Sequence, residues 1–345
     1  MTRLAITGGA GFLGCHLCKI LSNQYEEILL LDIAPFEPDE YPSNTTYLKV
    51  DVREKDRLEE ALKGTDFLIH AAGALPLYRE KEIFDTNIKG TRNTLEAARS
   101  HRIEKIIHIS STAVYGIPKK HPIEENDPLQ GVGAYGQSKI EAEKVCQEYQ
   151  KKGMCISVVR PKTFIGTGRL GVFQILYDWI KNGKRIPIIG KGRNRYQLLE
   201  VEDLVGAIQL LLLAPPEKAN SIFNVGAREF GTVSEDLTSL CQFAGTGARV
   251  FPTPALPVKL FLALLDQLKI SPLYPWVYKT ADKDSYVSIE KISRIFGWAP
   301  KYSNAQALIK SYDWYGTHCN ELSATGITHR TAWDQGALEV LKRFL

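Results

Sequence analysis

Three side chains near the middle of the chain have the types and the spacing that acid–base chemistry on an alcohol needs. Ser111 follows an apolar run, and Tyr135 and Lys139 lie four residues apart at the start of a predicted helix. Residues four apart share one helical face. A tyrosine normally titrates at about 10, and a neighbouring ammonium favours its phenolate. We predict that Tyr135 takes a proton from a substrate alcohol while Ser111 hydrogen-bonds the same oxygen.

Pairs of this kind occur by chance on many helices, so the prediction needs a nucleotide site nearby. The apolar run 4–6 leads into Thr7-Gly8-Gly9-Ala10-Gly11-Phe12-Leu13-Gly14, and an apolar helical pattern follows. Gly8 permits a tight turn, Gly11 lets a pyrophosphate approach the main chain, and Gly14 lets the helix pack closely on the sheet. The free N–H groups at the helix start face the phosphates. This strand, turn and helix predict a dinucleotide site.

An acidic residue at the end of the second predicted strand indicates which of the two nicotinamide dinucleotides, NAD or NADP, would bind. The apolar run 28–31 ends in Asp32, about 20 residues past the glycines, where a carboxylate binds the adenosine ribose hydroxyls. Asp32 would repel a 2′-phosphate. The sequence therefore predicts NAD rather than NADP as the cofactor.

Apolar runs alternate with amphipathic helical patterns in the first half of the chain. The predicted strands cover 2–7, 28–32, 46–50, 66–70, 104–110 and 154–160, and the helices cover about 12–22, 54–62, 80–100 and 134–151. This alternation predicts an α/β fold with a doubly wound parallel sheet. We predict a nucleotide-binding domain over 1–165, joined by 201–226, and a smaller, mostly helical substrate lobe from 166–200 and 227–315. The tail 316–345 receives no predicted role.

Composition narrows the class of protein. The 345 residues carry a net charge of +4 without a long basic run, which gives no reason to expect nucleic-acid binding. Six scattered cysteines form no disulfide framework, so we expect a reducing cytoplasm. Cys15 and Cys18 are expected to be buried on a helix, and we predict no metal site. We also expect neither a signal peptide nor a transmembrane segment, because the first strand begins at once and the apolar runs are short.

Together these motifs resemble the extended short-chain dehydrogenases/reductases, in the NAD-dependent epimerase/dehydratase group. The resemblance covers about residues 1–315 and is most specific at 7–14, at 110–116, and at Tyr135 with Lys139. It implies an NAD-dependent enzyme, a homodimer, and a catalytic set of Ser111, Tyr135 and Lys139, with Lys139 also on the nicotinamide ribose. Beyond the glycine loop and Asp32, it implies cofactor contacts at Asp51, Val52, Ala71, Ala72, Gly73, Asn87, Tyr135, Lys139 and Pro161.

The two residues that directly follow Ser111 bear on the reaction type. Dehydratases of this group resemble each other in an Asp-Glu pair there, which serves as acid and base for water elimination. This chain has Thr112 and Ala113 instead. Dehydration is therefore disfavoured, and reversible hydride transfer at one secondary alcohol carbon remains, ending in an epimer or in net oxidation or reduction.

The expected substrate contacts depart from the group's pattern. Nucleotide-sugar enzymes of the group resemble each other in an Asn and two Arg, where this chain has Thr163, Tyr196 beside Arg195, and Lys279. Arg193, Arg195 and Lys279 can still neutralise a diphosphate, although Arg and Lys are not equivalent for phosphate binding. A solvated turn is an equally good interpretation of Arg193 and Arg195. The predicted substrate contacts are Ser111, Thr112, Thr163, Arg195, Tyr196 and Lys279.

The leading interpretation is a nucleotide-sugar epimerase of the UDP-hexose 4-epimerase type, with a UDP-sugar as substrate. The alternative is a hydroxysteroid-dehydrogenase-like enzyme for an apolar alcohol or ketone. The apolar, proline-rich stretch 251–278 would suit it as a pocket wall, although that stretch could also be core or face a membrane. A non-catalytic NAD-binding regulatory protein is a third hypothesis, against which the intact Ser111, Tyr135 and Lys139 argue.

Overall fold

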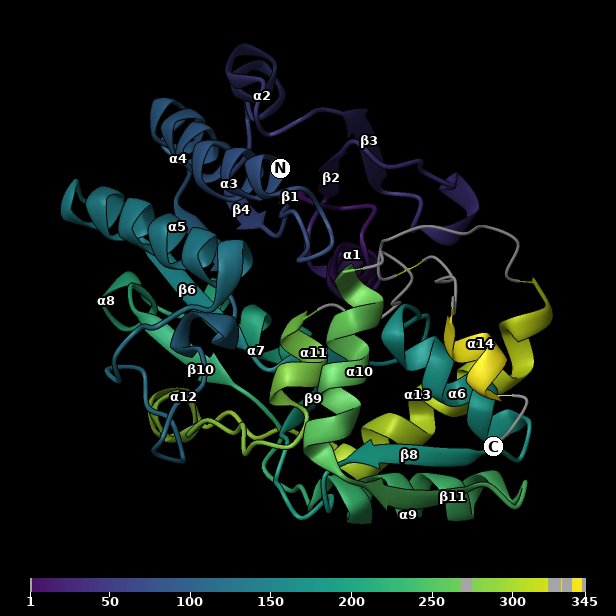
Figure 1. The fold of residues 1–345 in the computed structure, drawn as a ribbon. Coiled ribbons are helices and arrows are strands. Elements are labelled where there is room, and N and C mark those ends of the chain that lie inside the picture. The colour runs from purple at the N-terminus through teal and green to yellow at the C-terminus, as the bar shows by residue number, and fades with distance from the viewer. Residues whose placement is uncertain (1, 268–274, 322–329, 331–336, 343–345) are drawn as a thin grey trace.

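A computed structural model of the protein describes residues 2–267, 275–321, 330 and 337–342 (Figure 1). Its centre is a parallel sheet of seven strands in the order β10-β6-β5-β4-β1-β2-β3. The strands are β1 (Arg3–Thr7), β2 (Glu27–Asp32), β3 (Thr45–Lys49), β4 (Phe67–His70), β5 (Lys105–Ile109), β6 (Ile156–Pro161) and β10 (Ile222–Val225). The strand order reverses beside β1, between β2 and β4, which confirms the predicted doubly wound α/β fold.

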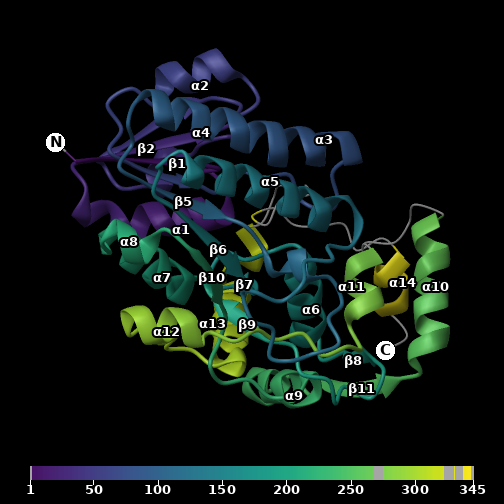
Figure 2. The ribbon, with the colours of Figure 1, turned by 90° about the vertical axis from the view of Figure 1, so that its left-hand side faces the viewer.

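Alternate residues of the central strands face opposite helix layers, as expected for strands buried on both sides. In β1, Leu4 and Ile6 face one layer and Ala5 faces the other. Figure 2 shows the two layers on either side of the sheet. The first layer contains α1 (Phe12–Leu21), α7 (Val201–Leu213) and α12 (Glu290–Phe296). The second contains α2 (Lys55–Ala61), α4 (Gly90–Ser100) and α5 (Gly133–Lys151).

Two predicted elements differ from the structure in detail. The helix predicted over 80–100 is divided into α3 (Glu80–Phe84), a π-helical turn (Asp85–Lys89) and α4. The region after 226 was predicted as mostly helical, yet it contains β11 (Arg249–Thr253), which pairs with β8 (Arg185–Ile189). A lone pair of short strands that meet from distant parts of the chain leaves little local signal.

The remaining elements lie beyond the carboxyl ends of the main strands. They have their own core, in which Tyr177, Trp179, Leu240 and Leu308 are buried together. A short parallel pair, β7 (Thr163–Ile165) with β9 (Leu198–Glu200), follows β6 and precedes α7. The helices here are α6 (Val172–Lys181), α9 (Val233–Ala244), α10 (Ala255–Gln267), α11 (Pro275–Thr280), α13 (Asn304–His318) and α14 (Ala337–Lys342), while the short α8 (Pro216–Ala219) precedes β10.

A buried ion pair ties α5 to β6. The Arg160 guanidinium, 1% exposed, donates to Glu143 Oε1 at 2.9 Å and Oε2 at 2.5 Å. It also donates to the Tyr115 hydroxyl at 2.7 Å, and that hydroxyl donates to Asn224 Oδ1 of β10 at 2.8 Å. Ser110, at the end of β5, donates to Glu143 as well. One polar network therefore joins three strand ends to the helix that carries Tyr135.

Glu143→Ala should destabilise the protein by about 3–5 kcal/mol, because it leaves the Arg160 charge buried without its carboxylate. The free energy of unfolding from urea titrations measures this loss. The matched control is Glu141→Ala on the same helix, whose exposed carboxylate pairs with Lys144 and should be worth less than about 0.5 kcal/mol. Equal losses in the two variants would contradict the importance of the buried pair.

Candidate active site

The glycine loop has the close backbone packing that was predicted from its spacing. Gly8 has φ +72°, and a Cβ there would lie 2.7 Å from the Ala72 nitrogen. A Cβ on Gly14 would collide with the Gly8 carbonyl. These positions admit only glycine, because each brings two main-chain segments together. The loop thus forms a narrow cradle between β1 and α1.

A cavity of about 290 Å³ opens from this loop across the carboxyl ends of β1, β2, β4 and β5. It lies at the carboxyl ends of the strands beside the point where their order reverses, which is the place of a dinucleotide site in a doubly wound sheet. Most of the predicted cofactor contacts line it, namely Gly8, Gly11, Phe12, Leu13, Gly14, Asp32, Asp51, Val52, Ala71, Ala72, Gly73, Tyr135 and Lys139. NAD therefore fits the residues that are present.

Two predicted cofactor contacts lie elsewhere. Pro161 lines a second cavity instead. Asn87 is buried beneath the first cavity, where its Oδ1 accepts from the Ala74 nitrogen at 2.8 Å and its Nδ2 donates to Ser138 Oγ at 2.9 Å. Asn87 therefore holds the loop after β4 against α5.

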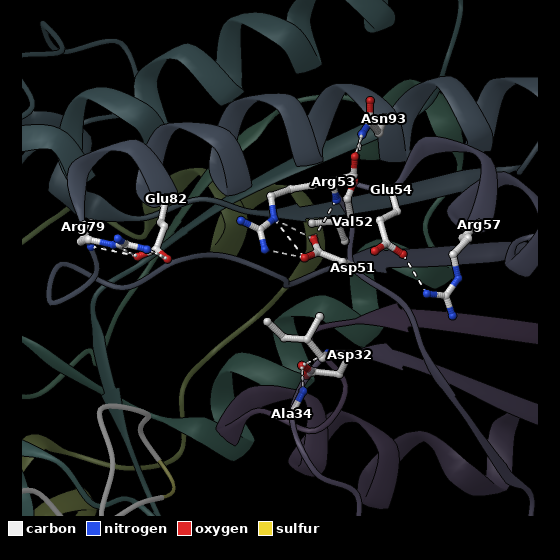
Figure 3. Close-up of polar contacts among 11 residues, drawn as sticks. Asp32, Ala34, Asp51, Val52, Arg53, Glu54, Arg57, Arg79, Glu82 and Asn93 are labelled. Atoms are coloured by element: carbon white, nitrogen blue, oxygen red, sulfur yellow. Dashed lines mark hydrogen bonds and ion pairs between the residues drawn. The ribbon is translucent and has the colours of Figure 1, made fainter.

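Two carboxylates, Asp32 at the end of β2 and Asp51 after β3, line one end of the first cavity, and Figure 3 shows them at the ends of these adjacent strands. Asp32 accepts from the main-chain nitrogens of Ala10 at 2.9 Å and Ala34 at 3.0 Å, so it fixes the loop on either side. Asp51 is held by the Arg53 guanidinium, whose hydrogen bonds also lower the pKa of that carboxyl. Asp32 therefore stays the predicted partner of the ribose hydroxyls.

Asp32→Ala should weaken NAD binding by about 10- to 100-fold, the usual effect of losing a hydrogen bond to a charged group. It should also narrow the preference for NAD over NADP, because the repulsion of a 2′-phosphate disappears. Titration calorimetry with both nucleotides measures these changes, and Asp39→Ala, at an exposed position, is the control. An unchanged ratio of the two affinities would contradict the ribose role of Asp32.

Tyr135 and Lys139 both line the first cavity from α5. Lys139 is almost fully buried, and its Nζ donates to the Ile109 carbonyl at 3.0 Å. Burial lowers the Lys139 pKa to about 8, while the Glu143 charge acts in the opposite direction. The ammonium lies 6.0 Å from the centre of the Tyr135 ring. A Cβ on Gly73 would sit 3.3 Å from Lys139 Nζ, so the loop after β4 closes over the lysine.

Burial dominates the ionisation of Tyr135. It raises the pKa of the phenol above its ordinary value, and the Ser111 hydroxyl and the Arg169 charge lower that pKa in part. Ser111 precedes a 3₁₀ turn (Thr112–Tyr115), and its Oγ accepts from the Ala113 nitrogen at 3.1 Å. The three predicted catalytic side chains therefore meet at one place, and their roles stay predictions.

The second cavity, of about 310 Å³, adjoins the first and shares Tyr135 and Phe164 with it. Four of the predicted substrate contacts line it: Ser111, Thr112, Thr163 and Tyr196. The Thr163 hydroxyl and the Tyr196 hydroxyl are hydrogen-bonded at 2.9 Å. The two cavities meet where hydride transfer would require them to meet.

The other two predicted substrate contacts line neither cavity. Arg195 is exposed, lies over the rings of Phe230 and Tyr286, and donates to the Phe230 carbonyl. Lys279 is exposed on α11. Neither is placed to neutralise a diphosphate inside the described cavities.

Sequence reasoning missed two cations that line the second cavity, Lys162 and Arg169. A lysine directly after Arg160-Pro161, at the end of a buried strand, is a sequence signal that could have identified the first. Arg169 lies in a glycine-rich loop, where an arginine is ordinarily solvated. Arg330 of the tail was missed too, and it donates to the Ala10 carbonyl of the glycine loop at 3.1 Å.

The apolar stretch 251–278 has two kinds of surface where it is described. In α10, Leu262 and Leu265 are buried with Tyr278. The opposite face is 52% to 71% exposed at Leu256, Leu260, Phe261 and Leu264. Leu268, Leu273 and Tyr274 lie outside the described residues. Within the described part of the chain, no helix is long and apolar enough to cross a membrane.

The fold and the paired cavities define an NAD-dependent enzyme of the extended short-chain dehydrogenase/reductase type. The model of the NAD dependent epimerase/dehydratase family matches residues 4–226, and the chain belongs to that family. This confirms the predicted family, enzyme class and cofactor.

Individual relatives differ in what is known of them. The chain is 34% identical to the uncharacterized protein y4nG of Sinorhizobium fredii, over 97% of this chain and 84% of that one. It is 30% identical to the N-acetyl-α-D-glucosaminyl-diphospho-undecaprenol 4-epimerase of Escherichia coli O157:H7, over 61% of this chain and 63% of that one. The fold is similar to that of a Thermotoga maritima UDP-glucose 4-epimerase solved with UDP-glucose (TM-score 0.77, 20% identity, 92% and 100% coverage).

Proposed function

We propose that the protein is a sugar epimerase of the UDP-hexose 4-epimerase type, with Tyr135 as its acid and base. The observation that carries the proposal is that Tyr135 lines both cavities, beside Ser111 on the substrate side and Lys139 on the cofactor side. A group that moves a proton at a carbon undergoing hydride transfer must stand at this junction.

Tyr135, Ser111 and Lys139 each have a separate role at the reacting carbon. Tyr135 takes the proton of the substrate hydroxyl and later returns it, and Ser111 holds that oxygen in place. Lys139 binds the nicotinamide ribose and adds positive charge near the phenol. When bound, NAD supplies reversible redox chemistry at the carbon. Its positive ring favours the phenolate, which burial alone disfavours in Tyr135.

The residues after Ser111 support epimerisation or net redox over dehydration. The Thr112 hydroxyl donates to the Pro161 carbonyl at 3.3 Å, and the methyl group of Ala113 can exchange no proton. Neither serves as the acid and base of water elimination. The second cavity also contains two buried cations, Lys162 and Arg169, which disfavours the alternative of an apolar alcohol substrate. A homodimer and a cytoplasmic location complete the proposal.

Tyr135→Phe should lower turnover by at least about 100-fold while NAD stays bound, because only the proton-transferring oxygen is removed. Interconversion of UDP-glucose and UDP-galactose, and of their N-acetyl and acid forms, measures turnover without added NAD. Tyr149→Phe is the control, on the same helix but lining neither cavity. Full activity in Tyr135→Phe would refute the mechanism.

We infer a second candidate substrate, a sugar diphosphate carried on a polyprenol. The exposed apolar face of α10 favours it, since four large side chains there face away from the small core formed by Leu262, Leu265 and Tyr278. Figure 2 shows α10 at the margin of the molecule, away from the main sheet. The E. coli relative acts, by its name, on such a lipid-linked sugar. An apolar helix face is suited to the boundary of a lipid layer.

Flotation with phosphatidylglycerol vesicles tests the lipid-linked candidate. The unsubstituted protein should float with the vesicles, and Leu260→Asp should lower partitioning by about 10-fold or more, the value of one buried leucine. Leu213→Asp is the matched control, because Leu213 is 69% exposed at the end of α7. If the unsubstituted protein stays in the dense fraction, a soluble nucleotide sugar remains the sole candidate of the two.

A further inference from the structure

The substrate cavity contains a lysine that the proposed mechanism does not use. Lys162 is 2% exposed and follows the last residue of β6. Its Nζ donates to Ser285 Oγ at 2.7 Å and lies 4.8 Å from the centre of the Tyr196 ring. Within the described residues no carboxylate pairs with it. A buried ammonium costs several kcal/mol of desolvation when nothing compensates for it, so its retention beside a ligand cavity indicates a ligand that does.

The Lys162 side chain is held at a fixed point. The main-chain nitrogen of Lys162 donates to the Val225 carbonyl at 2.9 Å. Ser285 is fixed through its main chain, which donates to the Arg195 carbonyl and accepts from the Gln197 nitrogen. The Tyr196 ring is fixed through the Thr163 hydroxyl. The ammonium has further N–H donors beyond the one used on Ser285, and they are available to a molecule in the cavity.

Arg169 brings a second positive charge to the same cavity. Its guanidinium carbon lies 5.3 Å from the centre of the Phe12 ring and 5.8 Å from those of Phe164 and Phe173. Arg169 is 6% exposed, and its charge reaches Tyr135, whose pKa it lowers. The described lining of the cavity contains these two cations and no Asp or Glu. An anion in the cavity would therefore meet positive charge in its described lining.

We propose that Lys162 and Arg169 form an anion subsite for the carboxylate of a nucleotide-linked uronic acid. The inference rests on the proposed function, because it takes the sugar carbon beside Tyr135 as the reacting one. Lys162 and Arg169 line the same cavity as Ser111 and Tyr135, the two groups proposed to act at the reacting carbon. The C6 carboxylate is bonded to C5, which is the ring neighbour of C4, whereas the diphosphate lies across the ring at C1. An anion inside the cavity with Ser111 and Tyr135 is therefore the carboxylate.

The test measures binding separately from catalysis. In NAD-saturated Tyr135→Phe, calorimetry gives the affinities for UDP, UDP-glucose and UDP-glucuronic acid. We expect UDP-glucuronic acid to bind at least about 30-fold more tightly than UDP-glucose, as for a desolvated charge pair. Lys162→Gln, which keeps a donor for Ser285 and removes the charge, should abolish most of this preference. Lys191→Gln, at an exposed lysine that lines neither cavity, is the matched control.

Two results would overturn the subsite. Equal binding of the two sugars would show that no carboxylate is recognised, and an equal loss of UDP affinity in Lys162→Gln would assign the lysine to the diphosphate. Turnover by the unsubstituted protein is scored independently. If neither sugar is converted although the Lys162-dependent preference is present, the proposed epimerase activity fails and the subsite stands. If UDP-glucose is converted and the preference is absent, the subsite fails and the activity stands.

Discussion

The buried pair of Arg160 and Glu143 fixes the geometry on which the site depends. Glu143 lies on α5, one helical turn beyond Lys139, and Arg160 lies at the end of β6, directly before Pro161 and Lys162. The pair therefore sets the distance between α5, the helix that carries Tyr135, and β6, the strand that leads into the second cavity. A buried ion pair adds little net stability, but separating it is costly. Because separating the two charges is costly, the pair holds α5 and β6 at a fixed distance.

Burial shifts the pKa values of three side chains in the two cavities, and charges on bound molecules would oppose these shifts. It raises the Tyr135 pKa and lowers the pKa values of Lys139 to about 8 and of Lys162 to about 7. Each shift disfavours the charged form that chemistry or binding would use. A hydrogen bond to the Ile109 carbonyl offsets only part of the desolvation of Lys139, and one to the Ser285 hydroxyl offsets only part of that of Lys162. What is still missing is charge of the right sign in each cavity, positive beside the phenol and negative beside Lys162.

The cofactor half of the site could be predicted from the sequence because its signals are local. The spacing of Gly8, Gly11 and Gly14 encodes a turn within a few residues, and Tyr135 and Lys139 encode a helix face. The substrate half could not be predicted in this way. Lys162 meets Ser285 across 123 positions of the chain. Arg195 is adjacent in sequence to Tyr196, which lines the cavity, yet the chain turns it outward.

This difference in range explains why the fold and the cofactor are easier to assign than the substrate. Main-chain geometry at the ends of parallel strands forms the glycine loop and the cavity beside it. A different sequence that forms the same turns would form the same cavity. The substrate cavity is instead bounded by side chains from separate segments, at Ser111, Lys162, Tyr196 and Ser285. Replacing Lys162 alters the charge of the cavity, and replacing one of the other three alters its shape or its hydrogen bonds. On the proposed subsite, substrate choice in this chain would depend on a few long-range contacts, with the buried charge of Lys162 foremost among them.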